Sequence, residues 1–228
     1  MHEEADVGQI IEFKRPDGSA CRGYLASAAQ GLPGVVVIQE WWGLNDQICG
    51  VADRFARAGF NALAPDLFKG RVTQEADEAS HLMNGLDFPG ATHQDIRGAV
   101  DHLRRLGSAK VAAMGFCMGG ALTIAAAVHV PDLAAGVCFY GIPPADFADP
   151  ANIRIPFQGH FAGKDDWCTP AAVDALEASM LAGGATPEIY RYAADHAFFN
   201  QERGEVYDAA CANAAWERSI AFLRRHLA

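Results

Sequence analysis

The stretch KVAAMGFCMGGALTIAAAVHV, residues 110–130, joins a short apolar run, a glycine-rich turn and an alanine-rich segment. Residues 110–115 are typical of a buried strand. Residues 118–130 are typical of a helix whose small side chains allow close packing on a sheet. Gly115, Gly119 and Gly120 surround Cys117 at the junction. We therefore predict a sharp strand-to-helix turn with Cys117 at its apex.

The same alternation of strand and helix patterns extends along the whole chain. Strands are predicted at residues 7–13, 22–26, 34–40, 61–66, 110–115, 134–140, 156–162 and 187–192. Helices are predicted at residues 45–58, 72–87, 91–106, 118–130, 169–183 and 208–227, of which 72–87 is polar and acidic and is a candidate cap over a site. Such alternation predicts an α/β fold with a mostly parallel central sheet and helices on both faces. We expect one domain over residues 1–228.

Composition restricts the classes of function. The chain has 228 residues, 50% of them hydrophobic, and a formal net charge of −10. Such apolar content excludes disorder as the main state, and the negative charge disfavours nucleic acids and anionic membranes as partners. No run of 18 apolar residues predicts a membrane span, and the first ten residues lack a signal-peptide pattern. We expect a cytoplasmic protein, a monomer or small homo-oligomer.

The turn at Cys117 matches the G-x-S-x-G nucleophile elbow, with cysteine in place of serine. A helix N-terminus favours a thiolate, so Cys117 is the candidate nucleophile. The alternative is a buried cysteine in a glycine-rich turn. The six cysteines are scattered without a C-x-x-C pair, and no histidine or carboxylate spacing indicates a metal site. We predict no metal.

A nucleophile of this kind needs a base oriented by a carboxylate, in the chain order nucleophile, acid, base. Of eight histidines, His196 follows the predicted strand 187–192 in a loop before the last helix, where this architecture places its base. Asp165 and Asp166 both follow the strand 156–162 and are candidates for the acid. Asp195 is adjacent to His196 in sequence and poorly placed to contact its Nδ1 atom.

Five motifs together resemble the dienelactone hydrolase family of the α/β-hydrolase superfamily, over roughly residues 7–227. They are Gln39-Glu40-Trp41-Trp42-Gly43-Leu44-Asn45, Pro65-Asp66-Leu67-Phe68, residues 115–120, Gly163-Lys164-Asp165 and His196-Ala197-Phe198-Phe199. The resemblance implies a triad of Cys117, Asp165 and His196, which selects Asp165 over Asp166. It implies no cofactor, and hydrolysis of an enol-lactone such as dienelactone (carboxymethylenebutenolide) in aromatic-compound degradation.

The resemblance also implies a role for Glu40, at the end of an early strand. We hypothesise that this carboxylate accepts a hydrogen bond from the thiol and keeps Cys117 protonated until substrate binds; the alternative is a structural carboxylate. The oxyanion hole needs backbone N–H donors, which we assign to Met118 and Trp41. Trp42 is expected to form a pocket wall or to be part of the core. The pocket candidates from strand and loop ends are Tyr140 and Phe198.

The sequence departs from the family at the arginines that bind the substrate. The best-known members bind the substrate carboxylate with two arginines, one in the cap and one four residues after the histidine. That second position is Asn200 here, and the cap stretch 72–87 has no arginine. Arg71 at its edge and Arg203 are the candidate substitutes.

We expect the partner to be a small-molecule lactone or ester, cleaved through a thioester acyl-enzyme. One alternative is a carboxylesterase or thioesterase with a different substrate range on the same triad. The other is a non-catalytic binding protein, which would not need nucleophile, acid and base in order.

Overall fold

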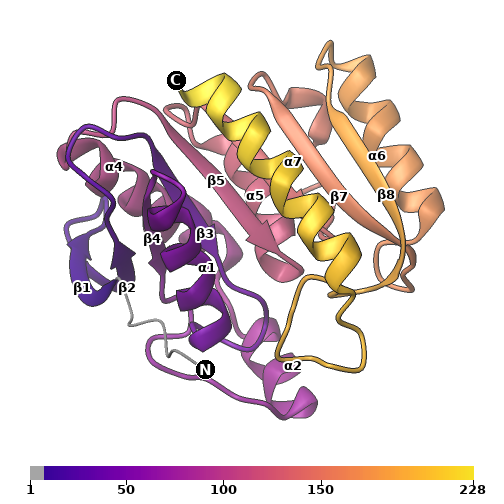
Figure 1. The fold of residues 1–228 in the computed structure, drawn as a ribbon, viewed down its shortest axis with the longest axis horizontal. Coiled ribbons are helices and arrows are strands. Elements are labelled where there is room, and N and C mark those ends of the chain that lie inside the picture. The colour runs from indigo at the N-terminus through magenta and orange to yellow at the C-terminus, as the bar shows by residue number, and fades with distance from the viewer. Residues whose placement is uncertain (1–7) are drawn as a thin grey trace.

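The computed structural model describes residues 8–228 and contains one eight-stranded sheet with helices on both sides (Figure 1). The strands are β1 (Gln9–Lys14), β2 (Ala20–Ala26), β3 (Gly34–Ile38), β4 (Asn61–Pro65), β5 (Val111–Phe116), β6 (Ala135–Phe139), β7 (Phe157–Lys164) and β8 (Glu188–Asp195). The helical segments are α1 (Asp46–Arg57), α2 (Ala76–Asn84), α3 (Phe88–Gly90), η1 (Ala91–Ile96), α4 (Arg97–Arg105), α5 (Met118–His129), η2 (Pro150–Asn152), α6 (Pro170–Ala182) and α7 (Ala209–Leu227).

The strand order is β1-β2-β4-β3-β5-β6-β7-β8. Strand β2 runs antiparallel to both of its neighbours, and the pairs from β4 to β8 are parallel. The predicted α/β fold with a mostly parallel sheet is therefore confirmed. Because the carboxyl ends of parallel strands lie at one edge of the sheet, residues after β3, β5, β6, β7 and β8 converge there.

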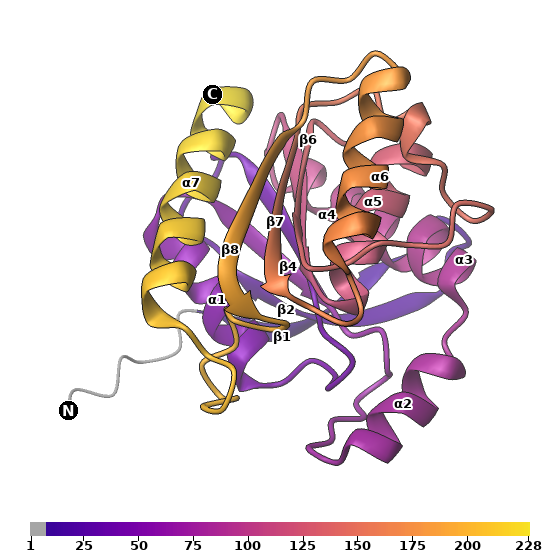
Figure 2. The same ribbon diagram turned by 90° about the vertical axis from the view of Figure 1, so that its right-hand side faces the viewer.

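Two layers of helices cover the sheet. Helices α1 and α7 pack on one face, and α4, α5 and α6 pack on the other (Figure 2). Every residue of β3, β5 and β6 is buried. This is why their sequences are continuous apolar runs rather than alternating ones.

Strand β8 runs to Asp195, three residues past the predicted strand end, and two predicted helices also differ in the structure. The predicted helix 72–87 is helical only in α2, because Thr73 is tied to the loop after β3 by its N–H bond to Trp42 O (3.0 Å) and its hydroxyl accepts the Glu75 N–H (3.0 Å). The predicted helix 91–106 begins as the π-helical segment η1 and continues as α4. The predicted strand start at Val7 lies outside the described residues, and the single-domain prediction stays a prediction.

Within residues 8–228, none of the helices has the length and hydropathy that a bilayer crossing requires.

Gly119, in the first turn of α5, lies directly against the carbonyl groups of Ile38 and Gln39 at the end of β3, and a Cβ atom there would overlap both oxygens. Gly50, in the middle of α1, has open space where its Cβ would lie. We predict that Gly119→Ala lowers the free energy of unfolding by at least about 2 kcal/mol through overpacking. Gly50→Ala should raise it by about 1 kcal/mol through helix propensity.

Urea denaturation followed by circular dichroism measures both changes. If both substitutions raised the free energy of unfolding equally, the close approach of α5 to β3 would not be needed for stability.

Candidate active site

Five strands of the sheet each deliver one polar side chain to the same edge. Glu40 follows β3, Cys117 follows β5, Tyr140 follows β6, Asp165 follows β7 and His196 follows β8. In the sheet β5 and β6 lie next to each other, with β3 on one side and β7 and β8 on the other. The topology therefore places Cys117 between Glu40 and the Asp165–His196 pair.

Cys117 occupies the apex of the predicted turn. Its backbone has a φ of 53° and a ψ of −116°, in the region that side chains other than glycine rarely adopt. The turn is held by a hydrogen bond from the Cys117 N–H to Phe139 O (3.0 Å). A Cβ at Gly115 would overlap the Gly119 carbonyl, so the glycines two before and two after Cys117 let the strand and the helix pack closely at the turn. The half-buried thiol lies at the N-terminus of α5.

His196 is oriented by Asp165. The His196 Nδ1 and Asp165 Oδ2 atoms are 2.7 Å apart. The other oxygen, Oδ1, accepts the N–H groups of Trp167 (2.8 Å) and Cys168 (2.9 Å), which fixes the carboxylate. Asp166 and Asp195 are exposed. The structure thus brings Asp165 to His196, whereas the sequence neighbours Asp166 and Asp195 face solvent.

The buried groups change one another's proton affinity. Burial alone would raise the pKa of Asp165, but the hydrogen bonds from His196, Cys168 and Trp167 lower it. Burial alone would lower the pKa of His196, but its contacts with Asp165 and Cys117 raise it to about 10. Burial raises the pKa of the Cys117 thiol, against the opposing effect of His196. Cys117 and His196 are coupled, because a thiolate at Cys117 raises the pKa of His196 and a charged His196 lowers the pKa of Cys117.

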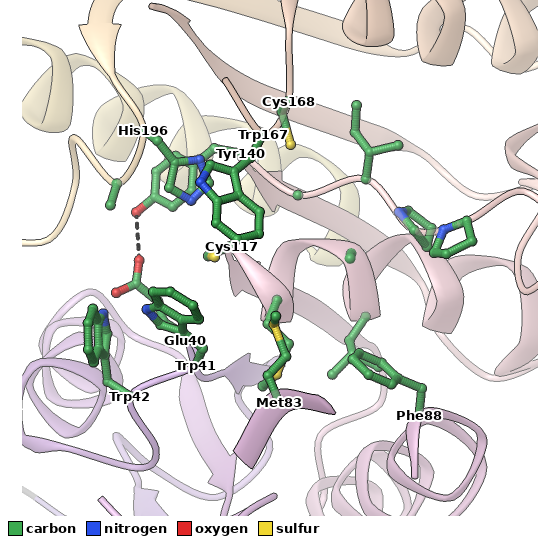
Figure 3. Close-up of a pocket in the computed structure, with 18 of the residues that line it drawn as sticks. Glu40, Trp41, Trp42, Met83, Phe88, Cys117, Tyr140, Trp167, Cys168 and His196 are labelled. Carbon is green, nitrogen blue, oxygen red and sulfur yellow. Dashed lines mark hydrogen bonds between the residues drawn. The ribbon is translucent and has the colours of Figure 1, made fainter. Parts of the chain in front are cut away.

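Glu40 is buried at the floor of the site, 2% exposed. Its Oε1 accepts the Tyr140 hydroxyl (3.2 Å), the contact drawn in Figure 3, and its Oε2 accepts the Asn200 amide (2.5 Å). Burial raises the pKa of Glu40. Tyr140 and Asn200 each bind one of the two carboxylate oxygens, and each oxygen keeps a second acceptor site, so the hypothesis of a hydrogen bond from the Cys117 thiol stays a prediction. Glu40 acts on Cys117 by charge and raises the pKa of the thiol.

A cavity of about 840 Å³ opens above these residues. Among the predicted site residues, the cavity is lined by Glu40, Trp41, Trp42, Cys117, Met118, Tyr140, His196 and Arg203. Met118 is the first residue of α5, so its N–H has no acceptor within the helix and is available to the site. No group of three or more metal-binding side chains occurs among residues 8–228.

Two predicted binding residues do not reach the cavity. Arg71 lines a separate depression, where it pairs with Glu78 at 3.4 Å. The Thr73 N–H ties the segment after Arg71 to the loop of Trp42, and α2 begins beyond that tie. The chain at Arg71 is therefore held away from the cavity. Phe198 is fully buried in the core behind Tyr140, with the two ring centroids 5.5 Å apart.

The sequence analysis missed much of the apolar wall, namely Met83, Phe88, Ile142, Phe147, Trp167 and Cys168. Met83 belongs to α2, so the candidate cap does contribute a side chain to the cavity. Trp167 could have been found from its position two residues after the predicted acid, because the loop that orients Asp165 must lie at the same sheet edge. Ile142 and Phe147 lie in the long loop after β6 and gave no such signal.

Comparison with known proteins shows the family of this chain. The model of the dienelactone hydrolase family matches residues 21–227. The chain belongs to the dienelactone hydrolase family. A relative from Aquifex pyrophilus named "Protein usf" is 35% identical over 97% of this chain and 100% of its own length. A relative from Aquifex aeolicus named "Putative carboxymethylenebutenolidase" is 31% identical with the same coverage.

A solved structure supports the same family. The crystal structure of a protein named "Putative Dienelactone Hydrolase" from Klebsiella pneumoniae superposes with a TM-score of 0.82 at 26% identity, covering 96% of this chain and 99% of that one. As a dienelactone hydrolase-like protein, the chain is an enzyme that hydrolyses carboxylic esters.

The Asp165 carboxylate should control the proton affinity of His196. In Asp165→Asn the imidazolium loses its charged partner, so the pKa of His196 should fall from about 10 towards 6.5. Asp195→Asn, which removes an exposed carboxylate beside His196 in sequence, should leave it unchanged. NMR titration of the histidine ring protons measures both. A fall in Asp195→Asn alone would contradict the assignment of Asp165.

Proposed function

We propose that this enzyme cleaves its ester through a Cys117–Asp165–His196 triad and a thioester acyl-enzyme. The observation that carries the proposal is the 2.7 Å contact between His196 Nδ1 and Asp165 Oδ2 beside a cysteine held at a strained strand-to-helix turn. This is the geometry that nucleophilic catalysis needs: a nucleophile that lines the cavity, a base next to it and a carboxylate that orients the base.

In the first half of the reaction, the Cys117 proton passes to His196 and the thiolate attacks the ester carbonyl carbon. The negative charge on the carbonyl oxygen is stabilised by the N–H groups of Met118 and Trp41. The tetrahedral intermediate collapses, the carbon–oxygen bond breaks, and the leaving oxygen takes the proton from His196. The product of this half is a thioester on Cys117.

In the second half, water attacks the thioester carbonyl and gives a proton to His196. The carbon–sulfur bond breaks, the carboxylic acid leaves, and the thiolate takes the proton back from His196. Asp165 keeps the imidazole in one orientation through both halves and stabilises its charged form.

The relatives' names support a lactone such as dienelactone as one candidate substrate. A second candidate, an esterase with a different substrate range on the same triad, is favoured by the amide of Asn200 at a position where the best-known members have an arginine. A cytoplasmic location and a place in aromatic-compound degradation stay predictions.

The test of the nucleophile is hydrolysis of dienelactone and of p-nitrophenyl acetate by wild type and by Cys117→Ala. We expect the variant to lose at least about 10³-fold in kcat/KM on whichever ester the wild type hydrolyses. Cys211→Ala, at a half-buried cysteine on α7, is the matched control and should keep full activity. Acid quenching during p-nitrophenyl acetate turnover should trap an acetyl group on the peptide that contains Cys117.

Wild-type activity in Cys117→Ala, or an acetyl group on a different residue, would remove Cys117 as nucleophile. Turnover of the aryl ester without dienelactone would keep the triad and favour the second candidate.

The raised pKa of His196 predicts the pH dependence. Because the base must be unprotonated to accept the Cys117 proton, kcat/KM should rise with pH from neutral towards about 10. In Asp165→Asn this ascending limb should move to lower pH, while the maximal rate falls by about 10²–10⁴-fold. Asp166→Asn, at an exposed carboxylate, is the control and should keep the wild-type profile. If the ascending limb of kcat/KM against pH stays at the same pH in Asp165→Asn, the ionisation of His196 does not determine it.

A further inference from the structure

We propose that the ester accepted by this cavity is uncharged and carries an extended apolar or aromatic group that reaches Phe88 and Phe147. This inference rests on the proposed function, because it takes Cys117 as the point of attack. It differs from the expected substrate, a small lactone with a free carboxylate, in both size and charge.

The cavity has a polar end and an apolar end. Cys117, Glu40, Tyr140 and His196 gather at one end, and Met83 and Phe88 lie away from His196 at the other (Figure 3). The apolar end continues along the loop after β6, through Ile142, Pro143, Pro144 and Phe147. At about 840 Å³ the cavity is within the usual range for drug-sized ligands, and a single lactone ring with one acetate arm would fill only part of it.

Contacts of the backbone carbonyl groups hold the two phenylalanines of the apolar end, Phe88 and Phe147, in place. Phe88 O accepts the Thr92 hydroxyl (2.9 Å), and Phe147 O lies 2.8 Å from the His129 Nε2 atom. Their rings meet edge to face with centroids 6.5 Å apart. Both side chains are only half-buried, so a ligand that reaches them removes apolar surface from water.

Tryptophans extend the apolar surface towards the reacting end. Trp167 is 66% exposed although its backbone N–H is fixed by Asp165. Its ring packs against Trp41 with centroids 5.8 Å apart, and against His196 at 6.3 Å. A large exposed aromatic ring on a fixed backbone is a ready surface for an apolar group beside the nucleophile.

The charges around the cavity disfavour an anion. Apart from His196, Arg203 is the one basic residue in the described lining, and it is already engaged: its guanidinium lies 4.9 Å from the Trp42 ring centroid and is paired with Glu205. The Asn200 amide donates to Glu40. Asp146 is exposed in the lining, and the whole chain carries a charge of −10. A substrate carboxylate would therefore meet repulsion without a free cation to offset it.

The test compares three p-nitrophenyl esters: the acetate, the hexanoate and the monoester of adipic acid, which replaces the terminal methyl of the hexanoate by a carboxylate. Rates are normalised to alkaline hydrolysis. We expect kcat/KM for the hexanoate to exceed that for the acetate by at least about tenfold, from burial of the added methylenes. The adipate monoester should be at least about tenfold slower than the hexanoate, and added salt should narrow that gap.

Variants locate the effect in the cavity. Phe88→Ala and Phe147→Ala should each reduce the hexanoate-to-acetate ratio by about fivefold or more, whereas Leu181→Ala, at an exposed apolar residue of α6, should not. Asp146→Asn should raise the adipate-to-hexanoate ratio. Circular dichroism checks that each variant is folded, and because Asp146 is exposed its substitution tests the charge argument even if a phenylalanine variant fails to fold.

The outcomes separate this inference from the proposed function. Cys117-dependent hydrolysis with the adipate monoester equal to or faster than the hexanoate would overturn the inference and leave the triad intact. Equal rates for acetate and hexanoate would overturn it as well. Hydrolysis that survives Cys117→Ala would remove the proposed function, and the inference with it, because the reaction would not take place in this cavity.

Discussion

The contact between the first turn of α5 and the end of β3 is the constraint on which the site depends. Gly119 has no side chain, so the helix backbone approaches the carbonyl groups of Ile38 and Gln39 directly. That approach brings Glu40 and Trp41, the second and third residues after β3, beside Cys117. The strained backbone at Cys117 costs about 1–3 kcal/mol, and the fully buried strands on either side of β5 hold it in place.

Two buried carboxylates with opposite shifts in proton affinity follow from this arrangement. Asp165 receives two backbone N–H bonds and the His196 ring, and its pKa is lowered. Glu40 receives only the neutral groups of Tyr140 and Asn200, and burial raises its pKa. Carboxylates whose environments separate their pKa values in this way have different roles at a site. Asp165 is suited to remain charged beside His196, and Glu40 is suited to bind a proton more readily.

Much of this could be predicted from the sequence, because the decisive signals are local. The glycines around Cys117 report a close approach of backbone. Residues that follow parallel strands must meet at one edge, which placed Asp165 and Asp166 near His196, and the family resemblance then selected Asp165. The direction of a side chain in a loop, by contrast, depends on tertiary contacts that neighbouring residues in the sequence do not reveal. Phe198, two residues after His196, turns into the core, whereas Trp167, two residues after Asp165, faces the cavity.

The errors at the cap have a tertiary cause as well. Helical periodicity over 72–87 could not show that Thr73 binds the Trp42 carbonyl and delays the helix to α2. The same tie places Arg71 on a different depression. Likewise, the absence of an arginine at position 200 is visible in the sequence, but the use of the Asn200 amide by Glu40 needs the folded contact across 160 positions of chain.

In the proposed mechanism, chemistry and substrate choice depend on different parts of the fold. Of its reacting groups, Cys117 follows the fully buried strand β5 and Asp165 follows the mostly buried strand β7, whereas His196 follows β8 at the edge of the sheet. The apolar lining comes from α2, the segment at Phe88 and the loop after β6, and α2 lies apart from the sheet in Figure 2. Loops on a rigid scaffold tolerate sequence change better than the scaffold itself. The size and charge of the accepted ester can therefore vary through Met83, Phe88 and Phe147 while the geometry of Cys117, Asp165 and His196 stays the same.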